Sequence, residues 1–264
     1  MLEVRHVSKT FNPGTVNEKK ALDDISLRLE DGDFVTVVGG NGAGKSTLLN
    51  MIAGVYPIDC GHIVLDGKEM STDPEYKRAR YIGRVFQDPL MGTAGDMAIY
   101  ENLAMANRRG KPRGLRWNVT AQEKEDFKNH LARLGLGLED RLTAKVGLLS
   151  GGQRQALTLL MASLQKPELL LLDEHTAALD PLTARKVLEL TEEIVQEEQL
   201  TTLMITHNMN DAIRIGNRLI MMYDGKIILD VRGEEKQKLT VEALHQKFRE
   251  AANEEFSDDR AVLI

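Results

Sequence analysis

The chain has 264 residues, enough for one large or two small domains, and its 42% hydrophobic and 28% charged residues are ordinary for a globular protein. A net charge of −6 argues against a dedicated nucleic-acid binder, and a single cysteine, Cys60, excludes an internal disulfide and a cysteine-based metal cluster. No apolar run reaches the roughly 18–20 residues that cross a bilayer, and the first residues lack the apolar core of a signal peptide, so we expect a cytoplasmic protein.

The first 87 residues have the pattern of short strands around one helix. Apolar and polar side chains alternate in the first two predicted strands, which indicates that one face of each is buried. Polar segments rich in Gly, Asn and Asp separate the strands and predict turns. The strands are expected at residues 2–7, 25–29, 34–38, 63–65 and 79–86, and the helix at residues 48–53.

Residues 88–165 show helical periodicity and no convincing strand. Residues 122–134 place Phe127, Leu131 and Leu134 on one face, as an amphipathic helix does. A second helix is expected from Gly151 to about residue 165, because Pro167 disfavours its continuation. This block is therefore predicted to be a helical insertion in an α/β domain.

An alternation of strands and helices resumes after this block. Residues 169–172 form a continuous leucine run, as expected for a parallel strand that is covered on both faces. Pro181 lies in its preferred position at the start of a helix. Later strands are expected at residues 202–206, 219–223 and 226–229, and a last helix at residues 241–248.

A glycine-rich segment follows the strand expected at 34–38 and matches the phosphate-binding pattern G-x-x-x-x-G-K-[ST]. Its glycines let backbone N–H groups point at phosphate oxygens, and the following helix adds unpaired N–H groups and a positive dipole end. Lys45 supplies a charge near the β- and γ-phosphates, and the Ser46 hydroxyl can ligate Mg²⁺. The predicted ATP-binding residues here are Gly39, Gly40, Asn41, Gly42, Ala43, Gly44, Lys45, Ser46 and Thr47.

Two other predicted strands also end in polar residues. Asp173 and Glu174 follow the leucine run, and His207 follows the strand at 202–206. Ligands bind beyond the carboxyl ends of strands in open parallel sheets, so we expect these residues and the phosphate-binding loop to gather around one nucleotide. Asp173 would hold Mg²⁺, Glu174 would act as general base, and His207 would contact the γ-phosphate or orient the water. A purely structural histidine is the alternative for His207.

Residues 149–155 read Leu-Ser-Gly-Gly-Gln-Arg-Gln and begin a helix. Ser150 and Gln153 have the spacing of a capping box, so a well-capped helix is one interpretation. A capping box alone does not need Gly151 and Gly152. The other interpretation is a second anion-binding helix end, which serves the nucleotide of a partner subunit.

Two charged stretches have no catalytic pattern. Residues 107–117 carry Arg108, Arg109, Lys111, Arg113 and Arg116 without an acidic residue. This stretch is either a solvated loop or a patch that faces anionic lipid or an acidic partner. The last fifteen residues are acidic and most simply form a solvated tail.

These motifs resemble the ATP-binding cassette (ABC) family, and the resemblance covers about residues 2–230. Residues 39–47 are similar to the Walker A motif, residues 149–155 to the signature, and residues 169–174 to Walker B. Residues 176–180 resemble the D-loop, which ends at Asp180. Three single positions complete the match: Gln87 with the Q-loop glutamine, His207 with the switch histidine, and Phe11 with an aromatic residue that stacks on adenine.

The resemblance implies an α/β P-loop NTPase core of the ABC type, with an antiparallel β subdomain and an inserted α-helical subdomain. The core with its β subdomain would comprise residues 1–87 and 166–232, and the helical subdomain residues 88–165. Residues 233–264 would form a C-terminal helix and an acidic tail.

The resemblance also implies a mechanism. Two cassettes close head-to-tail around ATP, so each nucleotide touches the Walker motifs of one subunit and Ser150, Gly151, Gly152 and Gln153 of the other. Glu174 activates water, His207 senses the γ-phosphate, Asp180 couples the two sites, and Ser46, Gln87 and Asp173 hold Mg²⁺. Loss of the γ-phosphate lets the dimer open.

One position departs from the family pattern. The family usually has proline after the catalytic glutamate, and this chain has His175. Because proline fixes φ, we expect the histidine to leave this turn freer and to add a titratable ring, without a catalytic role. The sequence Asp-Glu-His-Thr-Ala-Ala-Leu-Asp is similar to a subgroup of importer ATPases, some of which serve aromatic amino acids.

The resulting hypothesis is an ATPase subunit of a membrane importer of a small solute such as an amino acid. Its expected partners are a second cassette, separate permease subunits and an extracytoplasmic solute-binding protein, with no nucleic acid. It would lie on the cytoplasmic face of the cell membrane. The alternatives are the ATPase of an exporter or lipoprotein-release system, and a soluble cassette that scaffolds an assembly complex.

Overall fold

The computed structural model describes residues 1–111 and 119–261, with side chains described as far as residue 252 in the last helix. It divides into two compact units, Met1–Asp73 with Leu203–Ile264, and Pro74–Thr202. The domain boundaries that we expect at residues 87/88 and 165/166 follow the motifs rather than these units, and they stay a prediction. The units differ from that division because helix α5 packs against strand β6 and helix α6 within the second unit.

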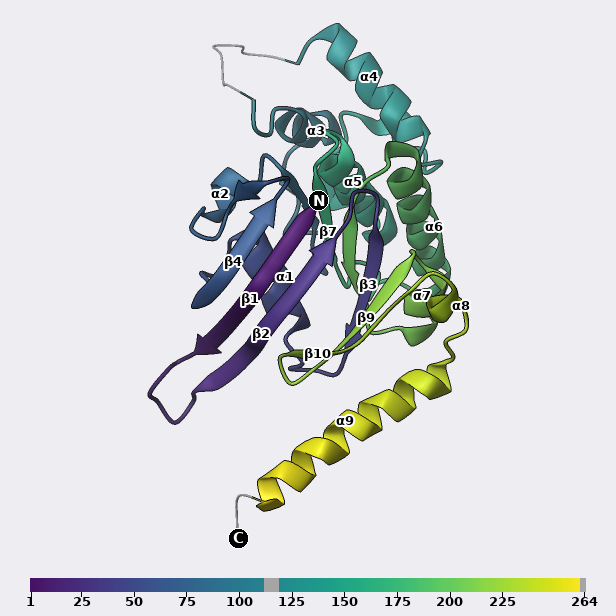
Figure 1. Ribbon diagram of the computed structural model, residues 1–264. Coiled ribbons are helices and arrows are strands. Elements are labelled where there is room, and N and C mark those ends of the chain that lie inside the picture. The colour runs from purple at the N-terminus through teal and green to yellow at the C-terminus, as the bar shows by residue number, and fades with distance from the viewer. Residues whose placement is uncertain (112–118, 262–264) are drawn as a thin grey trace. The chain divides into compact units, whose positions relative to one another are not determined.

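The first unit contains an antiparallel sheet of four strands in the order β2-β1-β4-β5. Figure 1 shows β1, β2 and β4 side by side. The strands expected at 2–7 and 25–29 are present but longer, because β-bulges interrupt the alternation on which the prediction depends. The bounds are β1 Leu2–Phe11, β2 Lys19–Leu29, β4 Cys60–Leu65 and β5 Lys68–Glu69.

A second group of strands in this unit carries the phosphate-binding loop. Strand β3 lies between β9, with which it pairs in parallel, and β8, and β9 forms an antiparallel hairpin with β10. The strands are β3 Phe34–Gly39, β8 Thr202–Ile205, β9 Arg218–Tyr223 and β10 Lys226–Arg232. The helices are α1 Lys45–Ala53, α7 Met209–Arg214, α8 Glu234–Gln237 and α9 Val241–Ala261.

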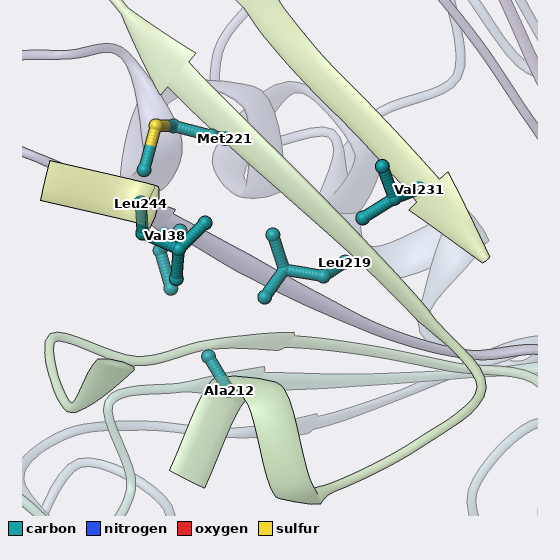
Figure 2. Close-up of a cluster of buried hydrophobic side chains, with 6 residues drawn as sticks. All are labelled: Val38, Ala212, Leu219, Met221, Val231 and Leu244. Atoms are coloured by element: carbon teal, nitrogen blue, oxygen red, sulfur yellow. The ribbon is translucent and has the colours of Figure 1, made fainter. Parts of the chain in front are cut away.

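The last helix, α9, contributes to the core of the first unit. Its Leu244 is fully buried in a cluster with Val38 of β3 and Met221 of β9 (Figure 2). Full burial of one such side chain stabilises a fold by about 1.5–3 kcal/mol. The helix begins at the expected residue and extends to Ala261 instead of ending near residue 248. The acidic side chains from Glu254 onward lie outside the described residues.

The second unit combines helices with two parallel strands. Strands β6 and β7 pair in register, with Val85 opposite Leu172. Strand β6 is shorter than the expected 79–86, because residues 79–81 complete the turn after α2. Within the described part of residues 88–165, helices dominate as expected and only an isolated bridge, Ala98 to Lys145, is β structure. The elements are α2 Glu75–Arg78, β6 Ile82–Val85, α3 Ile99–Asn107, α4 Ala121–Ala132, η1 Glu139–Arg141, η2 Val146–Leu148, α5 Gly151–Ser163, β7 Leu169–Asp173 and α6 Pro181–Glu198.

Candidate functional site

The phosphate-binding loop connects β3 to α1 in the first unit. The Lys45 ammonium group is buried and donates hydrogen bonds to the carbonyl oxygens of Gly39 (2.8 Å) and Gly40 (3.1 Å). Gly44 caps the helix with φ +97°, and a Cβ atom there would lie 2.5 Å from the Ala21 carbonyl oxygen, so only glycine fits. The loop therefore has the backbone curl and the placed lysine that binding of phosphate requires.

Two side chains beside this loop were not predicted from the sequence. A Cβ on Gly40 would lie 3.1 Å from Cζ of Phe248 in α9, and the Phe248 ring packs edge-on against Tyr223. A Cβ on Gly42 would lie 3.0 Å from the Lys19 ammonium nitrogen. Lys19 thus adds a positive charge near the loop, and Phe248 covers its backbone. Neither residue belongs to a local motif, so no sequence pattern identifies them.

Phe11, the predicted adenine-stacking residue, ends β1 opposite Lys19. Its ring is partly exposed and packs edge-on against Tyr56, with the ring centroids 5.3 Å apart. Because Lys19 lies beside Gly42, the structure brings Phe11 and the phosphate-binding loop to the same end of the first unit. Tyr56 is a second candidate for stacking that the sequence analysis missed.

His207 lies two residues after β8, and its side chain is exposed. The neighbouring Thr206 N–H donates to the Val37 carbonyl oxygen (3.1 Å), which ties this strand end to the strand that enters the phosphate-binding loop. His207 and the loop thus come from adjacent strands of one unit, as a γ-phosphate sensor requires.

In the second unit, Gln87 follows strand β6, and Asp173 is the last residue of its partner, β7. Gln87 comes two residues after Val85, whose partner Leu172 directly precedes Asp173. The Asp173 carboxylate is half-buried, and its Oδ2 lies 3.8 Å from the Arg84 guanidinium. Glu174 comes next with φ +44°, an uncommon backbone conformation for a residue other than glycine. The pairing of Val85 with Leu172 brings Gln87 and Asp173 to the same end of these two strands, and the predicted gathering of Asp173, Glu174, His207 and the phosphate-binding loop around one nucleotide stays a prediction.

Helix α5 reaches this edge through Gln155, whose role was not predicted. Gln155 is fully buried, and its Nε2 donates to the carbonyl oxygen of Phe86, the residue before Gln87 (3.2 Å). The feature that could have revealed it is an amide on the buried face of an otherwise apolar helix. Gln155 links the signature helix to the backbone of the Q-loop.

The capping-box interpretation of Ser150 and Gln153 is confirmed. The Gln153 N–H donates to Ser150 Oγ (3.3 Å), and the Ser150 N–H donates to Gln153 Oε1 (3.2 Å). Gly152 has a packing explanation that the sequence analysis lacked, because a Cβ there would come closer than 3.0 Å to Cγ2 of Thr183 in α6. Ser150 and Gly151 are exposed, which leaves this helix end accessible to a ligand.

Asp180 caps helix α6. Its Oδ1 accepts a hydrogen bond from the Thr183 N–H (3.1 Å), which lowers the pKa of the carboxyl. The side chain is exposed, so it stays an anion and is available to a partner. Because Thr183 also lies against Gly152, the structure brings the predicted D-loop residue and the signature helix together.

The basic stretch differs from the solvated-loop interpretation in its first residues. Arg109 is largely buried and donates from Nη2 to the Ala162 carbonyl oxygen (2.9 Å), and burial lowers the pKa of its guanidinium. Arg108 lies 3.5 Å from Glu123 in an ion pair. Arg113 and Arg116 lie outside the described residues.

Comparison with known proteins identifies the family. The sequence model described as "ABC transporter" matches residues 22–177, which is more than half of the chain. The chain belongs to the ABC transporter family. Members of this family hydrolyse ATP, and the chain is an ATP-binding ABC ATPase with the expected P-loop NTPase fold.

Several ABC proteins are similar over most of the chain. A tyrosine transport ATP-binding protein of Clostridioides difficile (strain R20291) is 45% identical over 95% of this chain and 100% of its own length. A xylose/arabinose import ATP-binding protein of Sulfolobus acidocaldarius is 36% identical over 89% of each chain. A methionine import ATP-binding protein of Enterococcus faecalis is 35% identical over 86% of this chain and 64% of its own length.

Solved ABC cassettes have the same fold. The ATP-binding cassette MJ0796, in a dimeric post-hydrolysis state with ADP and Pi, matches with a TM-score of 0.74 and 28% identity, over 88% of this chain and 98% of that chain. The cassette MJ1267 in its ADP conformation matches with a TM-score of 0.75 and 27% identity, over 90% of this chain and 93% of that chain. Across the part of the chain that the structure describes, no helix has the length and apolar character to cross a membrane.

Proposed function

We propose that this ABC ATPase powers an importer of a small solute such as an amino acid, with tyrosine as the first candidate. The observation that carries the proposal is the 45% identity to a tyrosine transport ATP-binding protein along that protein's whole length. Solute specificity would reside in separate permease subunits and an extracytoplasmic binding protein, with the cassette at the cytoplasmic face of the membrane.

We assign the steps of hydrolysis to individual residues of the chain. The loop 39–47 binds the phosphates, with Lys45 near the β- and γ-phosphates, and Phe11 with Tyr56 packs against adenine. Glu174 accepts a proton from the attacking water, and His207 contacts the γ-phosphate. Ser150 to Gln153 and Asp180 of a second cassette complete the site, which makes hydrolysis depend on dimer closure.

The oxygen-bearing side chains of Ser46, Gln87 and Asp173 are of the chemical type that Mg²⁺ binds. Among the described residues, no cluster of three or more His, Cys, Asp or Glu is placed to hold a metal. Mg²⁺ at a nucleotide commonly takes only one or two protein oxygens, with phosphates and water as its other ligands. We propose that the exposed Ser46 hydroxyl, the Asp173 carboxylate and the Gln87 amide oxygen fill this role. The bound ion neutralises charge on the β- and γ-phosphates.

A cleft in the second unit supports docking of a permease. Its volume is about 1130 Å³, and it combines exposed apolar side chains with basic ones. Arg109 lines it, and its buried Nε has no hydrogen-bond partner among the residues that the structure describes. We propose that a permease segment with an acidic residue occupies this cleft, since the basic lining residues outnumber its one acidic lining residue, Glu123, and would attract a carboxylate. The apolar lining includes Met91, Met105 and Phe86, and the basic lining Arg108, Arg109 and Lys111.

Reconstitution tests the function. The chain would be incorporated into lipid vesicles with its permease, and ATP hydrolysis would be measured with the binding protein empty, loaded with tyrosine, or loaded with methionine. We expect tyrosine-loaded binding protein to raise the rate several-fold. Equal rates for loaded and empty binding protein, together with co-purification in a soluble complex, would contradict the importer assignment.

A further inference from the structure

A short segment, residues 174–180, connects β7 to α6 in the second unit and includes the proposed general base. It is folded by two backbone hydrogen bonds, from Ala177 N–H to the Glu174 carbonyl oxygen (2.9 Å) and from Leu179 N–H to the Thr176 carbonyl oxygen (3.2 Å). Glu174 has φ +44°, which is costly for a side-chain-bearing residue unless its surroundings hold it. The position of the base therefore depends on what anchors this segment.

His175 anchors it. The imidazole is 2% exposed, and its Nε2 lies 3.0 Å from Oγ1 of Thr191 in α6. The Thr191 hydroxyl donates its proton to the Val187 carbonyl oxygen (2.8 Å), so its oxygen accepts from the ring. This arrangement fixes the tautomer with hydrogen on Nε2. The contact joins the residue next to Glu174 to the middle of an 18-residue helix.

This geometry corrects the expectation of a freer turn with a titratable ring. Burial lowers the pKa of His175 to about 4, so the ring is neutral over the pH range in which most enzymes work. The neutral ring has one N–H donor, and the Thr191 oxygen accepts it when that hydrogen is on Nε2. The buried ring restrains the segment through its contact with helix α6, whereas a proline would restrain it by fixing its own φ angle.

We infer that the hydrogen bond between His175 and Thr191 positions Glu174 for its reaction with water, in place of the proline usual in this family. His175 is thus a positioning residue, which acts through the backbone it shares with Glu174. The inference rests on the proposed role of Glu174 as general base. A misplacement of about 1 Å in a reacting group can lower a rate by as much as 10²-fold. Loss of the buried hydrogen bond at His175, the residue next to Glu174, is therefore sufficient to affect turnover.

The test compares Thr191→Val, which keeps the shape and removes the oxygen, with Thr191→Ser, which keeps the oxygen. We expect kcat for ATP hydrolysis by the full-length chain to fall about tenfold in Thr191→Val and to stay within about twofold of wild type in Thr191→Ser. The Kd of a fluorescent ATP analogue should stay within about twofold in both variants, because the phosphate-binding loop is unchanged. Nitrogen-15 NMR of the imidazole should show the Nε2–H tautomer in wild type and Thr191→Ser.

A matched control separates this effect from general loss of a buried hydroxyl. Ser163 in α5 also donates to the carbonyl oxygen four residues earlier, that of Leu159 (3.0 Å), and within the described part of the chain no histidine is hydrogen-bonded to it. Ser163→Ala should keep wild-type kcat. Normal kcat in Thr191→Val, or a parallel loss of ATP affinity, would overturn the inference. Glu174→Gln distinguishes the two hypotheses, since retained hydrolysis in that variant contradicts the role of the base itself.

Discussion

The packing role of Gly152 can be tested by adding a single methyl group. In Gly152→Ala the new Cβ would come closer than 3.0 Å to Cγ2 of Thr183, a separation that real Cβ atoms essentially never show. Overpacking of this kind costs about 1–3 kcal/mol. For a chain of this size, each kcal/mol lost from the free energy of unfolding lowers the melting temperature by about 2–4 °C. We therefore expect the melting temperature of Gly152→Ala to decrease by on the order of 5 °C.

The rescuing change is Thr183→Ser, which removes the obstructing methyl group and keeps the hydroxyl. In the double variant the melting temperature should return to within about 1–2 °C of that of Thr183→Ser alone, because the clash is gone. Thermal unfolding followed by circular dichroism on all four proteins completes the cycle. If Gly152→Ala lowers ATP hydrolysis without lowering the melting temperature, and Thr183→Ser does not restore it, the glycine serves nucleotide binding and our packing argument is wrong.

Three other predictions follow from the site. Glu174→Gln should bind ATP with near-normal affinity and lose at least about 10²-fold in hydrolysis, which single-turnover kinetics would measure; a rate within tenfold of wild type would remove Glu174 as the base. The pKa of His175 is lowered from 6.5 to about 4 in the folded chain, so between these pH values the unfolded chain binds a proton at this side chain and the folded chain does not. The free energy of unfolding should therefore decrease by up to about 3 kcal/mol as the pH falls from 6.5 to 4. Urea unfolding should show a flatter pH profile for His175→Gln, and an unchanged slope would contradict this assignment. Gly40→Ala should weaken ATP binding, because the added Cβ lies 3.1 Å from the Phe248 ring, and adding Phe248→Leu to that variant should partly restore the affinity. An equal Kd for ATP in the single and the double variant would show that the contact is unimportant.

Much of the fold could be predicted because its patterns are local. Strand β7 is a run of leucines that ends at Asp173 and was predicted with nearly correct bounds, and helix α6 begins at Pro181 as predicted. Strand β6 was predicted too long, since the propensity of Tyr81 and its neighbours is overridden by the turn that ends α2.

The site was predictable only where its residues form motifs. Lys45 and Ser150 belong to motifs whose residue spacing predicts their role. In the structure, Lys45 lies in the phosphate-binding loop and Ser150 caps a helix, as expected. The burial of His175 depends on Thr191, sixteen residues away on another element, and the cover of Gly40 depends on Phe248 near the other end of the chain. Such contacts arise from tertiary packing, which periodicity and spacing do not encode.

The position of Leu244 has a consequence for local unfolding. Helices near the end of a chain commonly fray at little cost in free energy. In this protein, opening the first turns of α9 would expose Leu244 together with Val38, the residue that leads into the phosphate-binding loop. We therefore expect hydrogen exchange in the last helix to be coupled to that of the strand that carries the nucleotide loop, so that ATP bound to the loop would slow exchange of amides about 200 positions later in the sequence.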